Sequence, residues 1–420
     1  MYSILISEIS LVLPFSQSLN PIITPFNFYT SDLTKSLSSQ SLLITGIILV
    51  SINLRTSIAS VGPLIPFIRE DLGLSNGLAG FLTTLPLLTF ATFSLFAPGI
   101  GKRLGMGRAV FLGVAILSTG VILRVLGGIE LLLFGTALTG IGIVIANVLL
   151  IPLIKVRLPE KLGLMTALLA TMMSLFAAIA VGVSVPIAVD WDFGWRGSLA
   201  FWAVFMVLAM IVWIPQLQRP KASLHQVTDP AKNVWKSKLA WQVTIFMGCQ
   251  SVMYFTMVTW LPDMLISRGW TPAQAGFVSS MMQVVSLLGS YFAPNFLIKL
   301  REQSGVVLAV GVAYVLGYSG LFIENELVTY ASLGIVGLCM GASLSIAYTL
   351  IALRTAEDQT TAKLSAMVQS SGYYLAALGP FLFGVSLDLF NNWNVLIFFL
   401  LFFALVFTFF GVSAGRDRKI

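Results

Sequence analysis

A single arginine lies in the middle of a long apolar stretch near the start of the chain. Arg55 occurs in the sequence VSINLRTSIAS, and the surrounding residues 42–68 are almost entirely apolar. If this stretch is a membrane helix, Arg55 lies roughly 20 Å past its start, at 1.5 Å per residue. A guanidinium that deep in a bilayer core of about 30 Å is costly and is usually functional. Two interpretations stay open: Arg55 binds the negative end of a solute, or it joins helices through backbone carbonyls.

Polar and aromatic side chains recur at helical spacing in several other apolar segments. Taken singly, such residues more often form hydrogen bonds between helices than contact a ligand. Together with one buried cation, they indicate a polar cavity lined by aromatic rings. The residues predicted to bind substrate are Arg55, Asn53, Asn147, Tyr254, Gln283, Tyr348, Gln369 and Tyr373.

Acidic residues are missing from the middle of every apolar segment, because all 17 Asp and Glu lie in loops, in tails or at segment ends. Proton relays usually rest on buried carboxylates or histidines, so no internal proton carrier is indicated. The only histidine, His225, lies in a polar loop, and the two cysteines are far apart in sequence. No metal cluster or nucleophile with its base is therefore predicted. We expect no enzyme activity, no metal and no cofactor, and a solute that is a small anion or has a negative end.

The composition predicts the environment that must position these residues. Hydrophobic residues make up 57% of the 420 residues and charged residues 10%, whereas soluble domains carry about 25% charged residues. The chain is therefore an integral membrane protein whose partner is the lipid bilayer, and its net charge of +7 does not indicate nucleic acid. A spanning helix needs about 20 apolar residues. Such segments occur at 42–68, 77–98, 108–127, 130–154, 164–188, 197–215, 239–262, 272–297, 305–323, 327–352, 363–387 and 394–413.

The loops between these segments alternate in charge. One set is basic and carries Lys102, Arg103, Arg108, Lys155, Arg157, Lys161, Arg219, Lys221, Lys232, Lys236, Lys238, Lys299, Arg301, Arg354, Lys363, Arg416, Arg418 and Lys419. The other set carries Glu70, Asp71, Glu130, Asp190, Asp192, Asp263, Glu324, Glu326 and Asp388, with four basic residues, Arg69, Arg124, Arg196 and Arg268. We call these two sides the basic end and the acidic end. The positive-inside rule predicts a multi-pass protein of the cell (inner) membrane, with the basic end and both termini in the cytoplasm.

The chain divides into two halves of six segments. Residues 138–157 align without gaps on residues 335–354, so that Gly140 matches Gly337 and Arg157 matches Arg354. The predicted fold is an all-α membrane protein with twelve transmembrane helices in two parallel six-helix repeats, the architecture of major facilitator transporters. The predicted parts are a disordered cytoplasmic tail (1–41), an N-terminal bundle (42–215), a cytoplasmic linker (216–238), a C-terminal bundle (239–413) and a short cytoplasmic tail (414–420).

Several quoted stretches resemble one known family. INLRTSIASVGPLIPFIREDLGLS, IGIVIANVLLIPLIKVRLP and LSAMVQSSGYYLAALGP are similar to the cyanate permease and 2-nitroimidazole transporter family of the major facilitator superfamily. The resemblance runs from about residue 42 to the C-terminus. It implies a monomeric transporter that works by alternating access on a small solute such as cyanate or a nitro-heterocycle.

Three further residues are predicted to take part in gating. The loop GIGKRLGMGR resembles the superfamily's cytoplasmic gate motif, which suggests Lys102 and Arg103, although Lys102 stands where an Asp is usual. Arg124 lies near the acidic end of its segment, where it either reaches the surface as an anchor or acts as a gate. Thr136 stands where many proton-coupled relatives have an arginine, and this departure, together with Lys102, argues against transferring the superfamily's usual proton-antiport mechanism.

Other functions remain as alternatives. A multidrug efflux transporter would depend on the aromatic side chains more than on Arg55. A membrane receptor or sensor would need a signalling domain, for which the short loops leave no room. The prediction that the residues favour is a transporter in which Arg55 binds the solute and the two halves rock about it.

Overall fold

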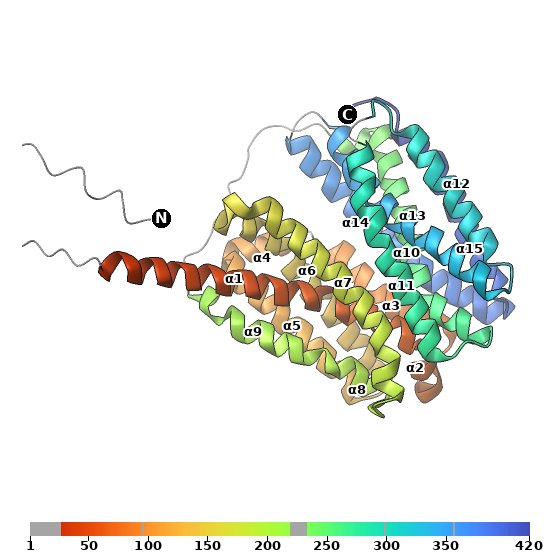
Figure 1. Ribbon diagram of the computed structural model, residues 1–420, viewed down its shortest axis with the longest axis horizontal. Coiled ribbons are helices and arrows are strands. Elements are labelled where there is room, and N and C mark those ends of the chain that lie inside the picture. The colour runs from red at the N-terminus through yellow and green to blue at the C-terminus, as the bar shows by residue number, and fades with distance from the viewer. Residues whose placement is uncertain (1–26, 95, 219–232, 298–299, 356–357) are drawn as a thin grey trace, which may run out of the picture. The chain divides into compact units, whose positions relative to one another are not determined.

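The computed structural model describes residues 27–94, 96–218, 233–297, 300–355 and 358–420 (Figure 1). In this part of the chain every regular element is a helix. The first half contains α1 (Asn27–Ala59), η1 (Gly62–Leu64), α2 (Ile65–Leu72), α3 (Asn76–Phe93), α4 (Ala97–Leu104), α5 (Met106–Leu126), α6 (Ile129–Arg157), η2 (Pro159–Lys161), α7 (Leu162–Val189), α8 (Gly194–Phe201) and α9 (Ala203–Leu217). The second half contains η3 (Val234–Lys236), α10 (Lys238–Ser267), α11 (Pro272–Leu297), α12 (Ser304–Gly320), α13 (Glu326–Leu353), α14 (Asp358–Phe390) and α15 (Asn394–Ala414).

The predicted spans correspond to these helices. Within the described residues, 11 helical stretches are long and apolar enough to cross a membrane. The shorter helix α12 has 17 residues and occupies the place predicted for the span 305–323. Two spans are interrupted: α1, η1 and α2 follow one another in the first, and α8 and α9 share the sixth. The predicted all-α membrane fold is confirmed.

The first helix begins earlier than predicted. We expected a disordered tail up to residue 41, but α1 starts at Asn27. The last proline before this point is Pro25, and no Pro or Gly occurs between residues 27 and 41. Helix-breaking residues are therefore missing from this stretch, and its polar serines and threonines do not prevent a helix. Residues 1–26 of the predicted tail lie outside the described residues.

Local sequence signals set several helix ends. Ser75, Ser237 and Asn325 precede α3, α10 and α13. The side chain of each accepts a hydrogen bond from the backbone amide three residues later. These N-caps satisfy amides that have no partner inside the helix. Gly73 ends α2 in the left-handed conformation, with φ of 63°, which a glycine adopts without strain.

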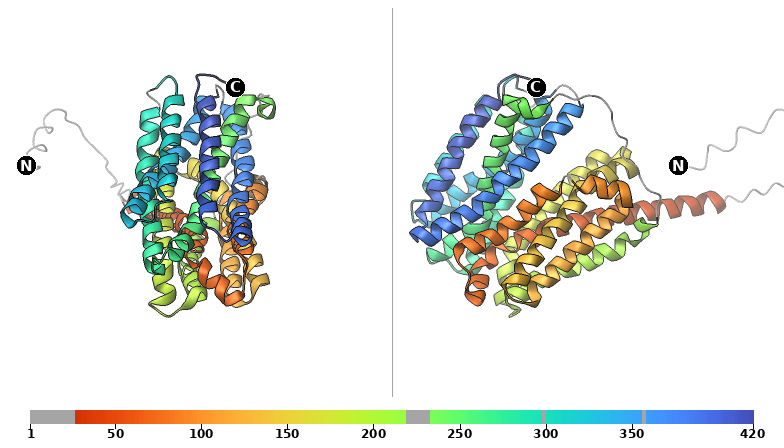
Figure 2. Two further views of the ribbon diagram at one scale, coloured as in Figure 1. Left: turned by 90° about the vertical axis from the view of Figure 1, so that its right-hand side faces the viewer. Right: turned by 180° about the vertical axis from the view of Figure 1, so that it is seen from behind.

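The two halves repeat one packing arrangement. A Cβ atom on Gly140 of α6 would lie 2.9 Å from Cα of Pro86 in α3, and one on Gly337 of α13 would lie 2.4 Å from the carbonyl oxygen of Met282 in α11. The aligned glycines thus let equivalent helices approach closely, as small residues do in membranes. Figure 2 shows the helices of each half grouped on their own side.

The halves meet along two pairs of helices. α3 packs against α14, and α7 packs against α11 (Figure 1). Thr84 of α3 donates a hydrogen bond to the carbonyl of Ala377 in α14 at 2.8 Å, and Ser280 of α11 donates one to the carbonyl of Ala178 in α7 at 2.7 Å. Most of the predicted linker, residues 219–232, lies outside the described residues. The remaining domain boundaries stay predictions.

Candidate functional site

Arg55 lies on α1, four residues before the helix ends at Ala59. Its side chain is half-buried. Within the described part of the chain it has no hydrogen-bond or ion-pair partner, although it interacts electrostatically with Tyr254, Tyr373 and Tyr348. Tyrosine hydroxyls are neutral dipoles, so they attract the guanidinium without neutralising it. Arg55 is therefore a cation whose donors are available to a ligand.

The larger cavity beside Arg55 lies between the two halves. α1 and α7 contribute side chains from the first half, and α10, α11, α13 and α14 contribute them from the second. The lining residues are Arg55, Ser174, Ala177, Gln250, Ser251, Tyr254, Phe255, Gln283, Ser286, Ser290, Met340, Gly341, Leu344 and Tyr373. Nine of these fourteen residues carry a hydroxyl, amide or guanidinium group, so the cavity is polar and contains one charge.

A second cavity meets the first at Arg55. Arg55, Phe255 and Tyr373 line both cavities. The second is mainly apolar and also contains Leu54, Ile58, Pro86, Leu87, Phe90, Gly140, Ile143, Asn147 and Met173. The ring centroids of Phe90 and Tyr373 are 4.7 Å apart, and those of Phe255 and Tyr373 are 6.3 Å apart. These rings form an aromatic wall between a polar and an apolar space.

The polar groups opposite Arg55 are arranged as hydrogen-bonding pairs. The hydroxyl of Tyr254 donates to Oε1 of Gln283 at 3.4 Å, which is a long and weak contact. The hydroxyl of Ser251 donates to Oε1 of Gln250 at 3.2 Å. A planar anionic or nitro group could take two donors from the guanidinium fork of Arg55. Neighbouring hydroxyls and amides could then bind the rest of a small polar solute.

Five of the predicted substrate-binding residues line these cavities: Arg55, Tyr254, Gln283 and Tyr373 the larger one, and Asn147 the smaller one. Tyr348 is 44% exposed and is not among the lining residues, although it interacts with Arg55 and Tyr373. The contact roles of these residues stay predictions.

Two other predicted residues, Asn53 and Gln369, have hydrogen-bond partners within the fold. Asn53 is fully buried, and its amide donates to the carbonyls of Leu49 at 2.7 Å and Phe205 at 3.0 Å. It therefore joins α1 to α9 and does not line either cavity. The amide of Gln369 donates to the hydroxyl of Ser365 at 2.9 Å, one turn earlier on the same helix. Neither Asn53 nor Gln369 is among the residues that line the two cavities, and their contact with a solute stays a prediction.

The predicted gating residues have contrasting surroundings. Arg124 is 1% exposed, so the expectation that it reaches the surface as an anchor is wrong. Its Nε donates to the hydroxyl of Thr136 at 3.0 Å, and its Nη1 donates to the carbonyl of Ser57 at 2.7 Å. Lys102 and Arg103 are exposed in α4 at the basic end. Gating by these three residues stays a prediction.

The predicted substrate-binding set left out most of the residues that line the cavities, among them Ser174, Phe90 and Phe255. Ser174 is one of four hydroxyl-bearing residues of the apolar helix α7, with Thr166, Thr171 and Ser184, and nothing in the sequence distinguishes it from the other three. Phe90 and Phe255 are ordinary apolar residues of membrane helices. No sequence signal separates them from the many other phenylalanines of this chain.

The known proteins that this chain resembles in sequence are transporters. A family model described as Major Facilitator Superfamily matches residues 43–380. The chain is 44% identical to the uncharacterized transporter YycB of Bacillus subtilis (strain 168), over 90% of this chain and 94% of that one. It is 36% identical to the 2-nitroimidazole transporter of Escherichia coli (strain K12), over 92% and 98% of the two chains. It is 26% identical to the cyanate transport protein CynX of the same organism, over 83% and 90%.

Solved structures share the fold at low sequence identity. A bacterial homolog of the human lysosomal transporter Spinster, in an inward-facing and occupied conformation, has a TM-score of 0.74 at 14% identity and covers 91% of this chain and 98% of its own. The xylose transporter XylE from E. coli, in an inward open conformation, has a TM-score of 0.71 at 12% identity, over 89% and 95% of the two chains. These likenesses show the fold alone.

Proposed function

Because the chain belongs to the major facilitator superfamily, and within it to the family of the cyanate permease and the 2-nitroimidazole transporter, we propose that it carries a small anion or small polar heterocycle across the bacterial inner membrane. Transport proceeds by alternating access about the cavity at Arg55. The basic end faces the cytoplasm, as the positive-inside rule expects. The protein works as a monomer, because one chain supplies the residues that line both cavities.

The observation that supports this proposal is the availability of Arg55. It lines both cavities, and within the described residues it interacts electrostatically with tyrosines and forms no hydrogen bond or ion pair. A buried charge without a counterion is unfavourable, and a bound anion or electron-rich group relieves that cost. The solute is therefore the partner that Arg55 lacks.

Ligand-dependent thermal stabilisation in detergent tests this proposal. Cyanate, nitrate and 2-nitroimidazole are screened against the wild-type protein and Arg55→Ala. A solute at 100 times its Kd should stabilise the wild type by about 2.7 kcal/mol. The same solute should not change the stability of Arg55→Ala. Arg301→Ala is the matched control, because the Arg301 side chain is 90% exposed, pairs with Asp417 and lines neither cavity.

Transport in proteoliposomes completes the test. Arg55→Ala should abolish uptake or export of the stabilising solute, while Arg301→Ala should transport at the wild-type rate. Wild-type transport by Arg55→Ala would contradict the proposal.

A multidrug transporter is the second candidate, because the aromatic wall of Phe90, Phe255 and Tyr373 could stack flat organic cations or neutral rings. The same measurements separate the two candidates. Stabilisation by several unrelated aromatic compounds, retained in Arg55→Ala and lost in Phe90→Ala, would favour multidrug transport.

A further inference from the structure

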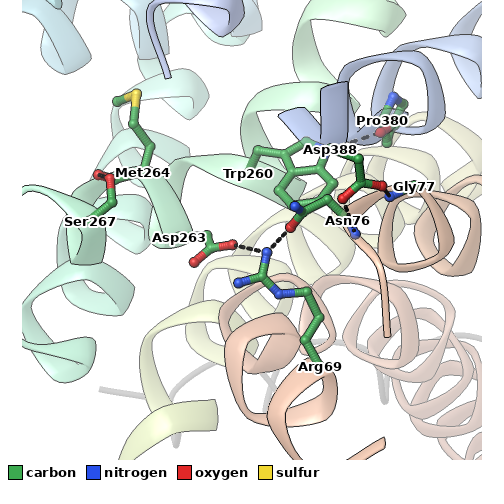
Figure 3. Close-up of polar contacts among 9 residues, drawn as sticks. All are labelled: Arg69, Asn76, Gly77, Trp260, Asp263, Met264, Ser267, Pro380 and Asp388. Atoms are coloured by element: carbon green, nitrogen blue, oxygen red, sulfur yellow. Dashed lines mark hydrogen bonds and ion pairs between the residues drawn. The ribbon is translucent and has the colours of Figure 1, made fainter. Parts of the chain in front are cut away.

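Two carboxylates of the second half hold one short segment of the first half. Asp263 lies near the end of α10, and Asp388 lies near the end of α14. Both reach the segment of residues 69–77, which contains the end of α2 and the start of α3 (Figure 3). The contacts therefore bridge the two halves at the acidic end.

The first bridge is an ion pair. Nη1 of Arg69 lies 3.0 Å from Oδ2 of Asp263 and also donates to Oδ1 of Asn76. The Asp263 side chain is 7% exposed and the Arg69 side chain 26% exposed, so water screens this pair poorly. Separating the halves here would leave the carboxylate of Asp263 without its ion-pair partner Arg69.

The second bridge is a helix cap supplied from the other half. The backbone amides of Asn76 and Gly77 donate to the two carboxylate oxygens of Asp388, at 2.9 and 2.7 Å. The hydroxyl of Ser75 accepts from the amide of Leu78. These amides open α3 and have no acceptor within the helix, and the helix dipole favours a negative charge there. α3 is thus fully capped only while the two halves are together.

Close backbone contacts surround both bridges. A Cβ atom on Gly384 of α14 would lie 2.3 Å from the carbonyl oxygen of Asn76, and one on Gly80 of α3 would lie 2.3 Å from that of Pro380. A Cβ atom on Gly62 would lie 2.4 Å from the carbonyl oxygen of Val258 in α10. The halves therefore approach each other here down to backbone contact.

The helices that carry these bridges also carry the cavity. α10 contains Asp263 and, eight residues earlier, Phe255 of the aromatic wall; α14 contains Asp388 and Tyr373. In the first half, Arg55 and Arg69 lie in the same membrane span. When the halves rock to open the acidic end, the same rigid helices must break both bridges.

We propose that Arg69, Asn76, Asp263 and Asp388 form a lock that holds the acidic end closed, and that the strength of this lock sets how often the cavity opens to that side. The proposal rests on the proposed function only through alternating access. It does not depend on which solute Arg55 binds.

Distances between spin labels at the acidic end test the lock without any solute. Cysteines replace Asp190 in the first half and Leu389 in the second, both exposed, after the buried Cys249 and Cys339 are replaced by alanine. In Asp388→Ala we expect a longer-distance population, with the ratio of open to closed molecules raised about tenfold, equivalent to about 1.4 kcal/mol. Arg69→Ala should act in the same direction. Asp388→Asn, which keeps the shape and one acceptor, should give a smaller shift and guards against misfolding of the alanine variant.

Asp71→Ala is the matched control. Asp71 also lies at the acidic end, but it accepts from Trp195 and Arg196 of its own half, at 3.1 and 2.7 Å. The Asp71→Ala substitution should therefore leave the distribution of distances between the two spin labels unchanged. Unchanged distances in Asp388→Ala and Arg69→Ala, or an equal shift in Asp71→Ala, would overturn the lock. Because no solute is present, this result is independent of whether Arg55→Ala loses binding.

Discussion

Arg55 and Arg124 are two arginines in apolar helices of the same half, yet their surroundings differ. Arg124 is almost completely buried and donates to Thr136 and to the carbonyl of Ser57. Arg55 is half-buried, borders two cavities and has no hydrogen bond within the described residues. An intramembrane cation that donates hydrogen bonds to acceptors within the protein stabilises the fold. A cation without such acceptors is available to bind a ligand.

The two arginines are also connected through α1. The amide of Val61 bonds to the carbonyl of Ile58 at 3.2 Å, because α1 ends at Ala59, and the carbonyl of Ser57 is the one to which that amide would bond in a continuing α-helix. Arg124 supplies a donor to Ser57 in its place. Arg124 thus stabilises the end of the helix that presents Arg55.

The largest effect that separates the two arginines should be on stability. Arg124→Ala leaves the carbonyl of Ser57 without this donor and opens a cavity, and we expect a loss of about 3 kcal/mol in the free energy of unfolding. Arg55→Ala removes no hydrogen bond, so its free energy of unfolding should stay within about 0.5 kcal/mol of the wild type. Reversible unfolding in mixed micelles measures both. Equal losses for the two variants would show that the environments are equivalent.

The next effect concerns affinity. Arg55→Lys keeps the positive charge but loses the planar fork that can donate two parallel hydrogen bonds. We expect the Kd of the stabilising solute to rise about tenfold, or about 1.4 kcal/mol, with no change in the melting temperature of the solute-free protein. Titration of the melting temperature with solute gives the Kd. A Kd equal to that of the wild type would mean that only the charge matters and that the solute is not held bidentately.

The comparison also shows what the sequence could predict. The depth of Arg55 follows from residue counting, and Tyr254, Gln283 and Tyr373 follow from helical spacing. The helical spacing of residues shows which of them share one face of a helix, but it does not show which neighbouring helix that face contacts. Asn53 was therefore assigned to the cavity, although its face packs against Phe205 of α9.

The errors share a physical cause, since each depends on a partner from elsewhere in the fold. The surface anchor was one of two alternatives for Arg124 because it lies close to a helix end, but Thr136 of α6 accepts a hydrogen bond from its Nε inside the bundle. Asp263 and Asp388 were recognised only as charges of the acidic end. Their contacts with residues 69–77 join segments nearly 200 and more than 300 residues apart, which charge counting along one chain does not reveal.

The smallest effect tests how much the tyrosines around Arg55 contribute. Tyr254→Phe removes a hydroxyl that donates to Gln283 through a long contact of 3.4 Å and that interacts with Arg55. We expect the Kd to rise only about twofold, or about 0.5 kcal/mol, as for a weak neutral hydrogen bond. Tyr374→Phe is the matched control, because that hydroxyl pairs with Thr92 at 2.9 Å and lines neither cavity. A loss of affinity in Tyr254→Phe as large as in Arg55→Lys would mean that the solute is held by the tyrosine as much as by the cation, and that the availability of Arg55 alone does not define the site.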